Sequence, residues 1–295
     1  MKEATRRPPK QLEQRIPKRL QKLVALAVLL ALCALWGYVI YLYTHPLTDW
    51  QGNYFPAIRD LLNGNSPYTG HRTYNPFWTY LLLAPFALLP PEIGSVAVGL
   101  VCMAVFAFVA WKLGAKPLSL AMLLSTPQLM FLSRNGNIDW LVVLGFIMPP
   151  QIGLFFVLIK PQIGLAVAVF WFIEAWRNGK IREIVRVFAP VSAAYLVGYL
   201  LFGVEAIWRG TEFIYIKYGW AATTFPFTIP VGLALLYKSL RSRNIMMSIS
   251  ASPFLAPYIA FYSWPAALLG IVDNTWLMVP AVIGMWILAI IKMQF

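Results

Sequence analysis

The sequence predicts an all-α, polytopic integral membrane protein with about nine to eleven transmembrane helices, at roughly twenty residues per span. The chain has 295 residues, of which 60% are hydrophobic and only 12% are charged, and its mean hydropathy is +0.67. Soluble domains are about 45–50% apolar and about 25% charged. Aromatic residues make up 15%, and aromatic side chains are enriched where helices meet the two membrane interfaces. These observations exclude a soluble enzyme, a disordered chain and a fibrous protein.

The charge distribution predicts the orientation of the chain. There are 24 Lys and Arg residues against 11 Asp and Glu, a net charge of +13. Residues 1–22 hold eight of the basic residues and adjoin the first apolar run. Charge in that place marks a cytoplasmic tail that contacts anionic lipid headgroups, and no nucleic-acid partner is expected. Residues 23–295 are predicted to form a single transmembrane domain in a prokaryotic plasma membrane.

Apolar runs predict the individual helices. Residues 23–43 are too long for the hydrophobic region of a signal peptide and lack its small-residue cleavage site, so an uncleaved anchor is expected. Residues 76–90 either cross the membrane or form a re-entrant helix, and only the re-entrant arrangement puts Lys112 and Lys116 on the cytoplasmic side. Further spans are expected at 92–111, 118–133, 187–204, 222–237, 246–271 and 275–292, with short pieces within 141–176.

The first external loop is predicted at residues 44–75, on the opposite side from the N-terminus. Apolar residues recur there at helical spacing from Tyr54 to Leu62. This pattern predicts a short amphipathic helix over residues 52–63, lying along the membrane interface and ended by Gly64.

Asp49 and Lys160 are the residues whose positions indicate chemistry. Asp49 follows the first span, and a carboxylate that is partly desolvated there has a raised pKa and suits a general base; a solvated loop residue or a helix cap is the alternative. Lys160 lies between apolar pieces, just before Pro161. It either contacts a phosphate or extends toward lipid headgroups.

Other polar groups are weaker candidates. Arg134, Asn135, Asn137 and Asp139 form either a polar turn or a site for the hydroxyls of a sugar-like ligand. Glu174 is interpreted as the one acid deep in an apolar run, which argues against a proton-coupled transporter. Both cysteines lie in apolar runs, and no nucleotide-binding or metal-binding motif occurs. No metal and no cofactor are therefore predicted.

Four segments in order resemble the GT-C superfamily of membrane glycosyltransferases. They are TDWQGNYFPAIRDLLNGNSPYTGHRTYNPFWTYLLLAPFALLP (48–90), GNID (136–139), IKPQIGL (159–165) and SASPFLAPY (250–258). The branch that they resemble most is the bacterial polyprenyl-phosphate-mannose-dependent mannosyltransferases. The chain departs from the family pattern at Asn75, where a proline is usual, and at Asn135-Gly136-Asn137, which lacks the usual glutamine.

The resemblance implies a function and a set of site residues. A sugar, mannose in this branch, would pass from a polyprenyl-phosphate donor to a glycolipid or glycan acceptor at the external face, with inversion and without a metal. Asp49 would be the general base, and Lys160 and Arg134 would bind the donor phosphate. The substrate-binding residues would be His71, Arg72, Tyr74, Asn75, Asn137, Gln162 and Tyr258. A non-catalytic scaffold or assembly subunit of this fold and a lipid or solute transporter are the alternatives.

Overall fold

A computed structural model describes residues 18–46, 48–70, 74–203 and 225–293 of the chain. Over these residues the protein is helical and has no extended strand, which confirms the predicted all-α class. The chain divides into two units, residues 1–36 and residues 37–295. The described part of the first unit belongs to helix α1 (Lys18–Leu42), and residues 1–17 of the predicted basic tail lie outside the described residues.

Prolines begin many of the helices in the second unit. The fixed backbone angle of proline suits the first helical turn, where its missing N–H leaves no hydrogen bond unmade. The helices that begin at a proline are α4 (Pro91–Lys112), α5 (Pro117–Leu124), α6 (Pro127–Asn135), α8 (Pro150–Val157), α9 (Pro161–Phe202) and α13 (Pro265–Leu268). The others are η1 (Trp50–Tyr54), α2 (Phe55–Leu62), α3 (Phe77–Ala87), α7 (Asp139–Gly145), α11 (Ile229–Ser242), α12 (Met246–Leu255), η3 (Phe261–Ser263), η4 (Leu269–Ile271) and α14 (Thr275–Met293).

Two of the predicted continuous spans are broken in the structure. Residues 118–133 form α5 and α6, because Thr126 precedes Pro127 and takes an extended conformation. Residues 246–271 form α12 and three short helices, and Ala256, which precedes Pro257, is again extended. A proline ring clashes with a helical residue before it, so both corrections have the same steric cause.

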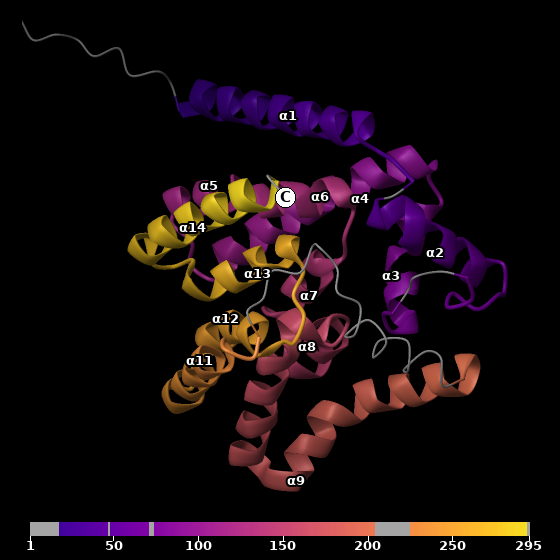
Figure 1. Ribbon diagram of the computed structural model, residues 1–295, viewed down its shortest axis with the longest axis vertical. Helices are drawn as coiled ribbons and strands as arrows, with labels where there is room; N and C mark the ends of the chain where they lie inside the picture. The colour runs from indigo at the N-terminus through magenta and orange to yellow at the C-terminus, as the bar shows by residue number, and fades with distance from the viewer. Residues whose placement is uncertain (1–17, 47, 71–73, 204–224, 294–295) are drawn as a thin grey trace, which may run out of the picture. The chain divides into compact units, whose positions relative to one another are not determined.

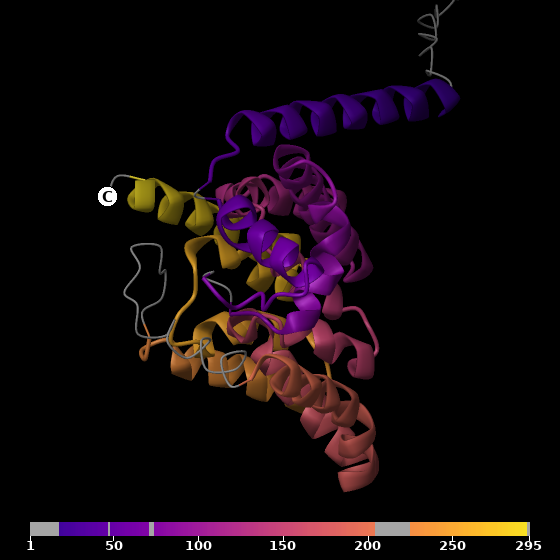
Figure 2. The same ribbon diagram turned by 90° about the vertical axis from the view of Figure 1, so that its right-hand side faces the viewer.

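Helix α9 contains a sharp bend among Arg177, Lys180, Arg182 and Arg186, four basic residues whose clustering in the sequence predicts a cytoplasmic loop. Gly179 and Lys180 have non-helical backbone angles, and φ of Lys180 is +50°. The two halves of α9 diverge from this bend (Figure 1, Figure 2). The basic residues therefore flank a bend between two helical halves rather than occupying a loop.

The predicted amphipathic helix in the first external loop forms, as η1 followed by α2. Its apolar face is covered by the protein only in part, because α2 packs on α3 and both Ala57 and Ile58 are fully buried, whereas Leu62 is 46% exposed. Gly64 follows with φ of +82°, which supports the predicted end of the helix. Part of the helical spacing in this loop thus reflects packing inside the chain, and the position of the helix along a membrane interface stays a prediction.

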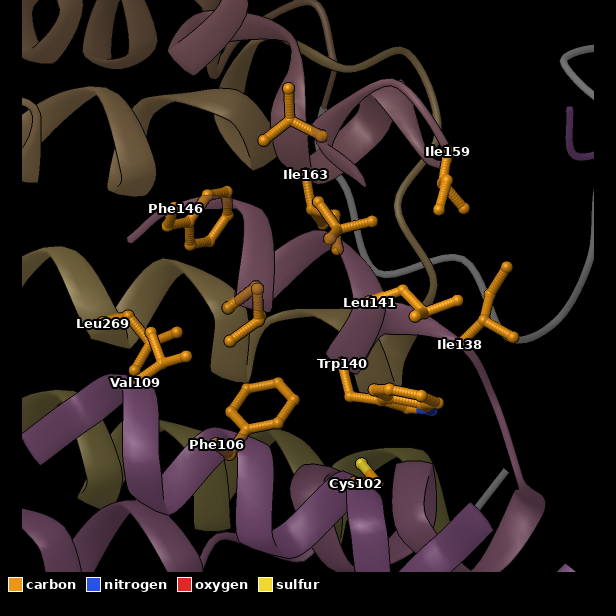
Figure 3. Close-up of a cluster of buried hydrophobic side chains, with 14 of the residues drawn as sticks. Cys102, Phe106, Val109, Ile138, Trp140, Leu141, Phe146, Ile159, Ile163 and Leu269 are labelled. Carbon is orange, nitrogen blue, oxygen red and sulfur yellow. The ribbon is translucent and has the colours of Figure 1, made fainter. Parts of the chain in front are cut away.

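The core of the second unit lies where α4, α6 and α7 pack together. Phe106 and Val109 of α4 are fully buried, and in Figure 3 Phe106 lies toward Trp140 of α7 while Val109 lies beside Leu269. Helices α8, α9, α11 and α12 continue this packing (Figure 1). The loop between α6 and α7 is held at one edge of the core.

Two of the described helices, α4 and α9, have the length and apolar composition needed to cross a membrane. Buried core helices of soluble proteins have the same composition, but only 17% of the apolar window of α9 is buried inside the protein. Helix α3, in the ambiguous segment 76–90, has 11 residues. At about 1.5 Å per residue it is too short to cross about 30 Å of hydrocarbon alone.

Candidate functional site

Asp49 is positioned by the residue that follows it. The Trp50 side chain is fully buried, and its Nε1 donates a hydrogen bond to the Pro91 carbonyl at 3.1 Å. The loop after α6 packs against the same indole. A Cβ on Gly136 would lie only 2.5 Å from the Trp50 Cβ, and Gly136 has φ of +65°. Only glycine meets both demands without strain.

The close approach of Gly136 brings an asparagine on each side of it to Asp49. Asn135 and Asn137 both donate side-chain N–H groups to Asp49 Oδ2, with Asn137 at 2.7 Å. The Asp49 backbone N–H donates in return to Asn135 Oδ1 at 3.2 Å. Tyr262 donates its hydroxyl to the same carboxylate oxygen at 3.2 Å, and Asn53 donates to Oδ1 at 3.4 Å. The carboxylate is therefore held in one orientation by four side chains.

Lys160 lies at the junction between α8 and α9, where its backbone is not helical. Its Nζ lies 2.5 Å from Asp139 Oδ1 and donates to Ser263 Oγ at 3.0 Å and to Asn137 Oδ1 at 3.4 Å. The ammonium also lies 5.2 Å from the centroid of the Tyr262 ring. Lys160 is thus paired with Asp139, the first residue of α7, which follows the asparagines that bind Asp49.

Asn137 and Tyr262 connect the two predicted functional residues. The Asn137 amide donates to Asp49 and accepts from Lys160. Asp49, Lys160 and Tyr262 are partly exposed, whereas Asn137 and Asp139 are buried. The structure therefore brings the predicted base and the predicted phosphate contact into one network with an accessible edge.

The environment of Asp49 changes its acidity. Burial raises the pKa of the Asp49 carboxyl above its ordinary value, and the negative charge of Asp139 adds to this effect. The hydrogen bonds from Asn137 and Tyr262 and the positive charge of Lys160 lower the pKa, but burial dominates. A carboxylate with a raised pKa accepts a proton from a hydroxyl more readily than an ordinary one.

Sequence reasoning did not name Tyr262, and it did not identify Asp139 as the partner of Lys160. Asp139 was named only in the cluster that forms either a polar turn or a site for sugar hydroxyls, and in the structure its side chain has no exposed surface and it begins α7. Glu174, which the sequence places deep in an apolar run, pairs with Arg177 and Arg243 instead of joining this network. Lys160 itself was the available signal, since a cation between apolar segments needs an acid, and Asp139 lies 21 residues before it in the chain. Nothing in the sequence distinguishes Tyr262 from its aromatic neighbours.

Arg134 and Asn75 lie beside the network rather than in it. The Arg134 guanidinium lies over the rings of Tyr43 and Phe131, at 5.5 and 5.1 Å from their centroids. Phe131 stacks on Tyr262 with a centroid distance of 5.8 Å. The Asn75 Nδ2 donates to the backbone carbonyl that precedes Lys160 at 2.9 Å. Asn75 therefore fixes the chain next to Lys160.

The remaining predicted substrate contacts are not joined to Asp49 by the hydrogen bonds described above. Tyr258 is buried four residues before Tyr262. Gln162 has its side-chain carbonyl oxygen buried without a hydrogen-bond partner in the described part of the chain. Tyr74 is partly exposed. His71 and Arg72 lie outside the described residues.

Metal ligands do not gather in the described ranges, where no three His, Cys, Asp or Glu side chains form a cluster. Comparison with protein-family models, with curated proteins and with solved structures finds no match to this chain. The chemistry of the site therefore has to be argued from its own geometry.

Proposed function

We propose that the protein is a membrane glycosyltransferase of GT-C-like architecture that moves a sugar, mannose in the first instance, from a polyprenyl-phosphate donor to a glycolipid or glycan acceptor. The observation that carries the proposal is the connection of Asp49 to Lys160 through Asn137. Such a transfer needs a base to take the proton of the acceptor hydroxyl and a cation to stabilise the departing phosphate, and this network holds one of each.

The reaction assigns one role to each group. An acceptor hydroxyl oxygen forms a bond to the anomeric carbon while its proton passes to Asp49. The bond from that carbon to the phosphate oxygen breaks on the opposite face, so the product is inverted. The departing polyprenyl phosphate carries the bonding electron pair and is stabilised by the Lys160 ammonium. The 3.4 Å contact of Lys160 with Asn137 is the weakest of its three hydrogen bonds, and a donor phosphate would replace it.

Exposed apolar side chains support a membrane location. Leu200 at the end of α9 is 72% exposed, Trp276 in α14 is 87% exposed, and neighbouring large apolar residues on both helices are also exposed. Apolar surface of this kind marks contact with lipid or a partner. In this proposal α3 is a re-entrant helix, so that Lys112 and Lys116 lie on the cytoplasmic side and the site opens externally. The polytopic arrangement of about nine to eleven spans, in a prokaryotic plasma membrane, belongs to the same proposal.

The experiment uses full-length protein in nanodiscs with radiolabelled polyprenyl-phosphate-mannose and a lipid extract from the native host as acceptor. We expect label transfer by the wild type and its loss in Asp49→Asn. Asp273→Asn is the matched control, because it makes the same change at an exposed position. Transfer that persists in folded Asp49→Asn would remove Asp49 from the mechanism. Absence of transfer from both mannose and glucose donors in the wild type would favour a scaffold.

A proton-coupled transporter is the second candidate, because the buried Asp139–Lys160 pair lies in one network with Asp49. Ionisable groups inside a membrane protein commonly mark proton pathways. Proteoliposomes with an internal pH indicator separate the two functions. Proton flux that requires Asp139 but no sugar donor would support the transporter, and transfer without flux would support the enzyme.

A further inference from the structure

A second charged site lies away from Asp49, between α9 and the end of α11. A hollow of about 310 Å³ is lined by Arg177, Asn178, Leu240, Arg241 and Arg243. Helices α9 and α11 pack against each other, and the lining residues of α9 come directly before its bend (Figure 1). Three of the five lining residues are arginines, which carry planar sets of N–H donors.

Glu174 organises two of these arginines without neutralising the site. Arg177 contacts Glu174 Oε1 at 2.7 Å, and Arg243 contacts Oε2 at 2.8 and 2.9 Å. Arg243 also donates to Asn178 at 3.1 Å, and Arg177 donates to the Leu240 carbonyl at 2.6 Å. Two guanidinium groups are therefore held in place.

Arg241 supplies the third guanidinium group, which differs from the other two in its lack of partners among the described residues. Within the described part of the chain its side chain makes no hydrogen bond or ion pair, and it is exposed. Three guanidinium groups against the one Glu174 carboxylate leave two positive charges in excess. No described residue uses the N–H donors of Arg241, which leaves them for a ligand.

The left-handed backbone conformation of Arg243 indicates that an arginine side chain is needed at this position. Arg243 ends α11 with φ of +53° and ψ of 34°, and its N–H donates to the Ser239 carbonyl. Glycine usually occupies this left-handed position because a side chain makes it unfavourable. A glycine would cap the helix equally well but would remove a guanidinium from the hollow. Strained backbone of this kind is concentrated at functional sites.

We propose that this hollow is a binding site for a phosphate group, gripped by Arg241 together with the preorganised Arg177 and Arg243. Arginine forks match the oxygens of phosphate and bind them through charge-assisted hydrogen bonds. The excess charge suits a phosphate monoester, carried either by a soluble phosphate compound or by the headgroup of an anionic lipid. The site is independent of Asp49 and of sugar transfer.

The test measures binding to the full-length protein in detergent. The soluble probe is inorganic pyrophosphate, followed by calorimetry. The lipid probe is dioleoyl phosphatidic acid, followed by native mass spectrometry, with dioleoylglycerol as the control that lacks the phosphate. We expect Arg241→Ala to weaken binding by about tenfold, the effect of losing one charge-assisted hydrogen bond. Arg186→Ala is the control, because it removes another exposed arginine of the chain that does not line the hollow.

Arg243→Gly provides a variant in which misfolding is not expected. It relieves the positive φ and removes a half-exposed ion pair with Glu174 and a hydrogen bond to Asn178, so stability should be kept while binding is lost. Binding of pyrophosphate identifies a soluble ligand, and selective retention of phosphatidic acid identifies a lipid. The proposal is overturned if neither probe binds, or if Arg186→Ala weakens binding as much as Arg241→Ala does.

Discussion

The ammonium group of Lys160 lies 2.5 Å from the carboxylate of Asp139, whose side chain has no exposed surface. The second oxygen of that carboxylate, Oδ2, has no hydrogen-bond partner among the described residues. Asp139 therefore depends on Lys160 for compensation of its charge. Burying a charge without a partner is among the most costly arrangements in a protein.

Removing Lys160 should destabilise the protein more than removing both charges. Lys160→Met leaves Asp139 charged and buried, and we expect a loss of about 3–5 kcal/mol in the free energy of unfolding. Adding Asp139→Asn should recover a large part of that loss. Unfolding in detergent, followed by circular dichroism, measures both variants. Lys112→Met at the end of α4 is the control, with an expected change within about 0.5 kcal/mol.

The same pair of variants separates stability from sugar transfer. We expect the stabilised double variant Lys160→Met/Asp139→Asn to remain without transfer activity, because the departing phosphate lacks its cation. Transfer by this variant at the wild-type rate would remove Lys160 from the proposed mechanism. It would leave the ion pair with a structural role alone.

The raised pKa of Asp49 predicts a pH-dependent cost to stability. The folded state holds the Asp49 proton more tightly than the unfolded state, whose pKa is near the ordinary 3.8. Stability therefore falls as pH rises from that value to the folded-state pKa and is constant above it. We expect the unfolding free energy of the wild type relative to Asp49→Asn to fall with pH over this window. Asn53→Ala keeps the carboxylate and should keep the slope, whereas a difference that rises with pH would contradict the raised pKa.

Gly136 should tolerate alanine less well than another glycine with a similar backbone. Both Gly136 and Gly64 have positive φ, but a Cβ at Gly64 meets nothing within 4 Å, whereas at Gly136 it would meet Trp50. Each alanine adds a left-handed backbone penalty of about 1–2 kcal/mol. Gly136→Ala should cost more than Gly64→Ala in thermal unfolding and should also lower transfer, because Asn135 and Asn137 flank it. Equal costs would show that the contact with Trp50 relaxes freely.

The sequence was sufficient for the helical class, and the family resemblance implied a shared site for Asp49 and Lys160, but neither showed how the helices are divided. Hydropathy averages over a proline, so 118–133 and 246–271 looked continuous although Pro127 and Pro257 interrupt them. The helical periodicity identified α2 correctly, but it does not show which apolar residues of this helix pack on α3 and which are exposed. Asp139 pairs with Lys160 because of the way α7 packs, and the composition of the sequence does not reveal that packing.

Asn75 provides the test that separates a positioning role from substrate contact. Its side chain donates to the Ile159 carbonyl at 2.9 Å, and its own carbonyl accepts from the Tyr68 hydroxyl at 2.9 Å. Asn75→Ala should lower kcat by about tenfold while KM changes little. The reason is that the variant removes the fixed position of Lys160 but removes no contact with the substrate. Tyr68→Phe is the control, since it removes a hydrogen bond to Asn75 but keeps the one to Ile159. A rise in KM with unchanged kcat in Asn75→Ala would instead support the sequence-based prediction that Asn75 binds substrate.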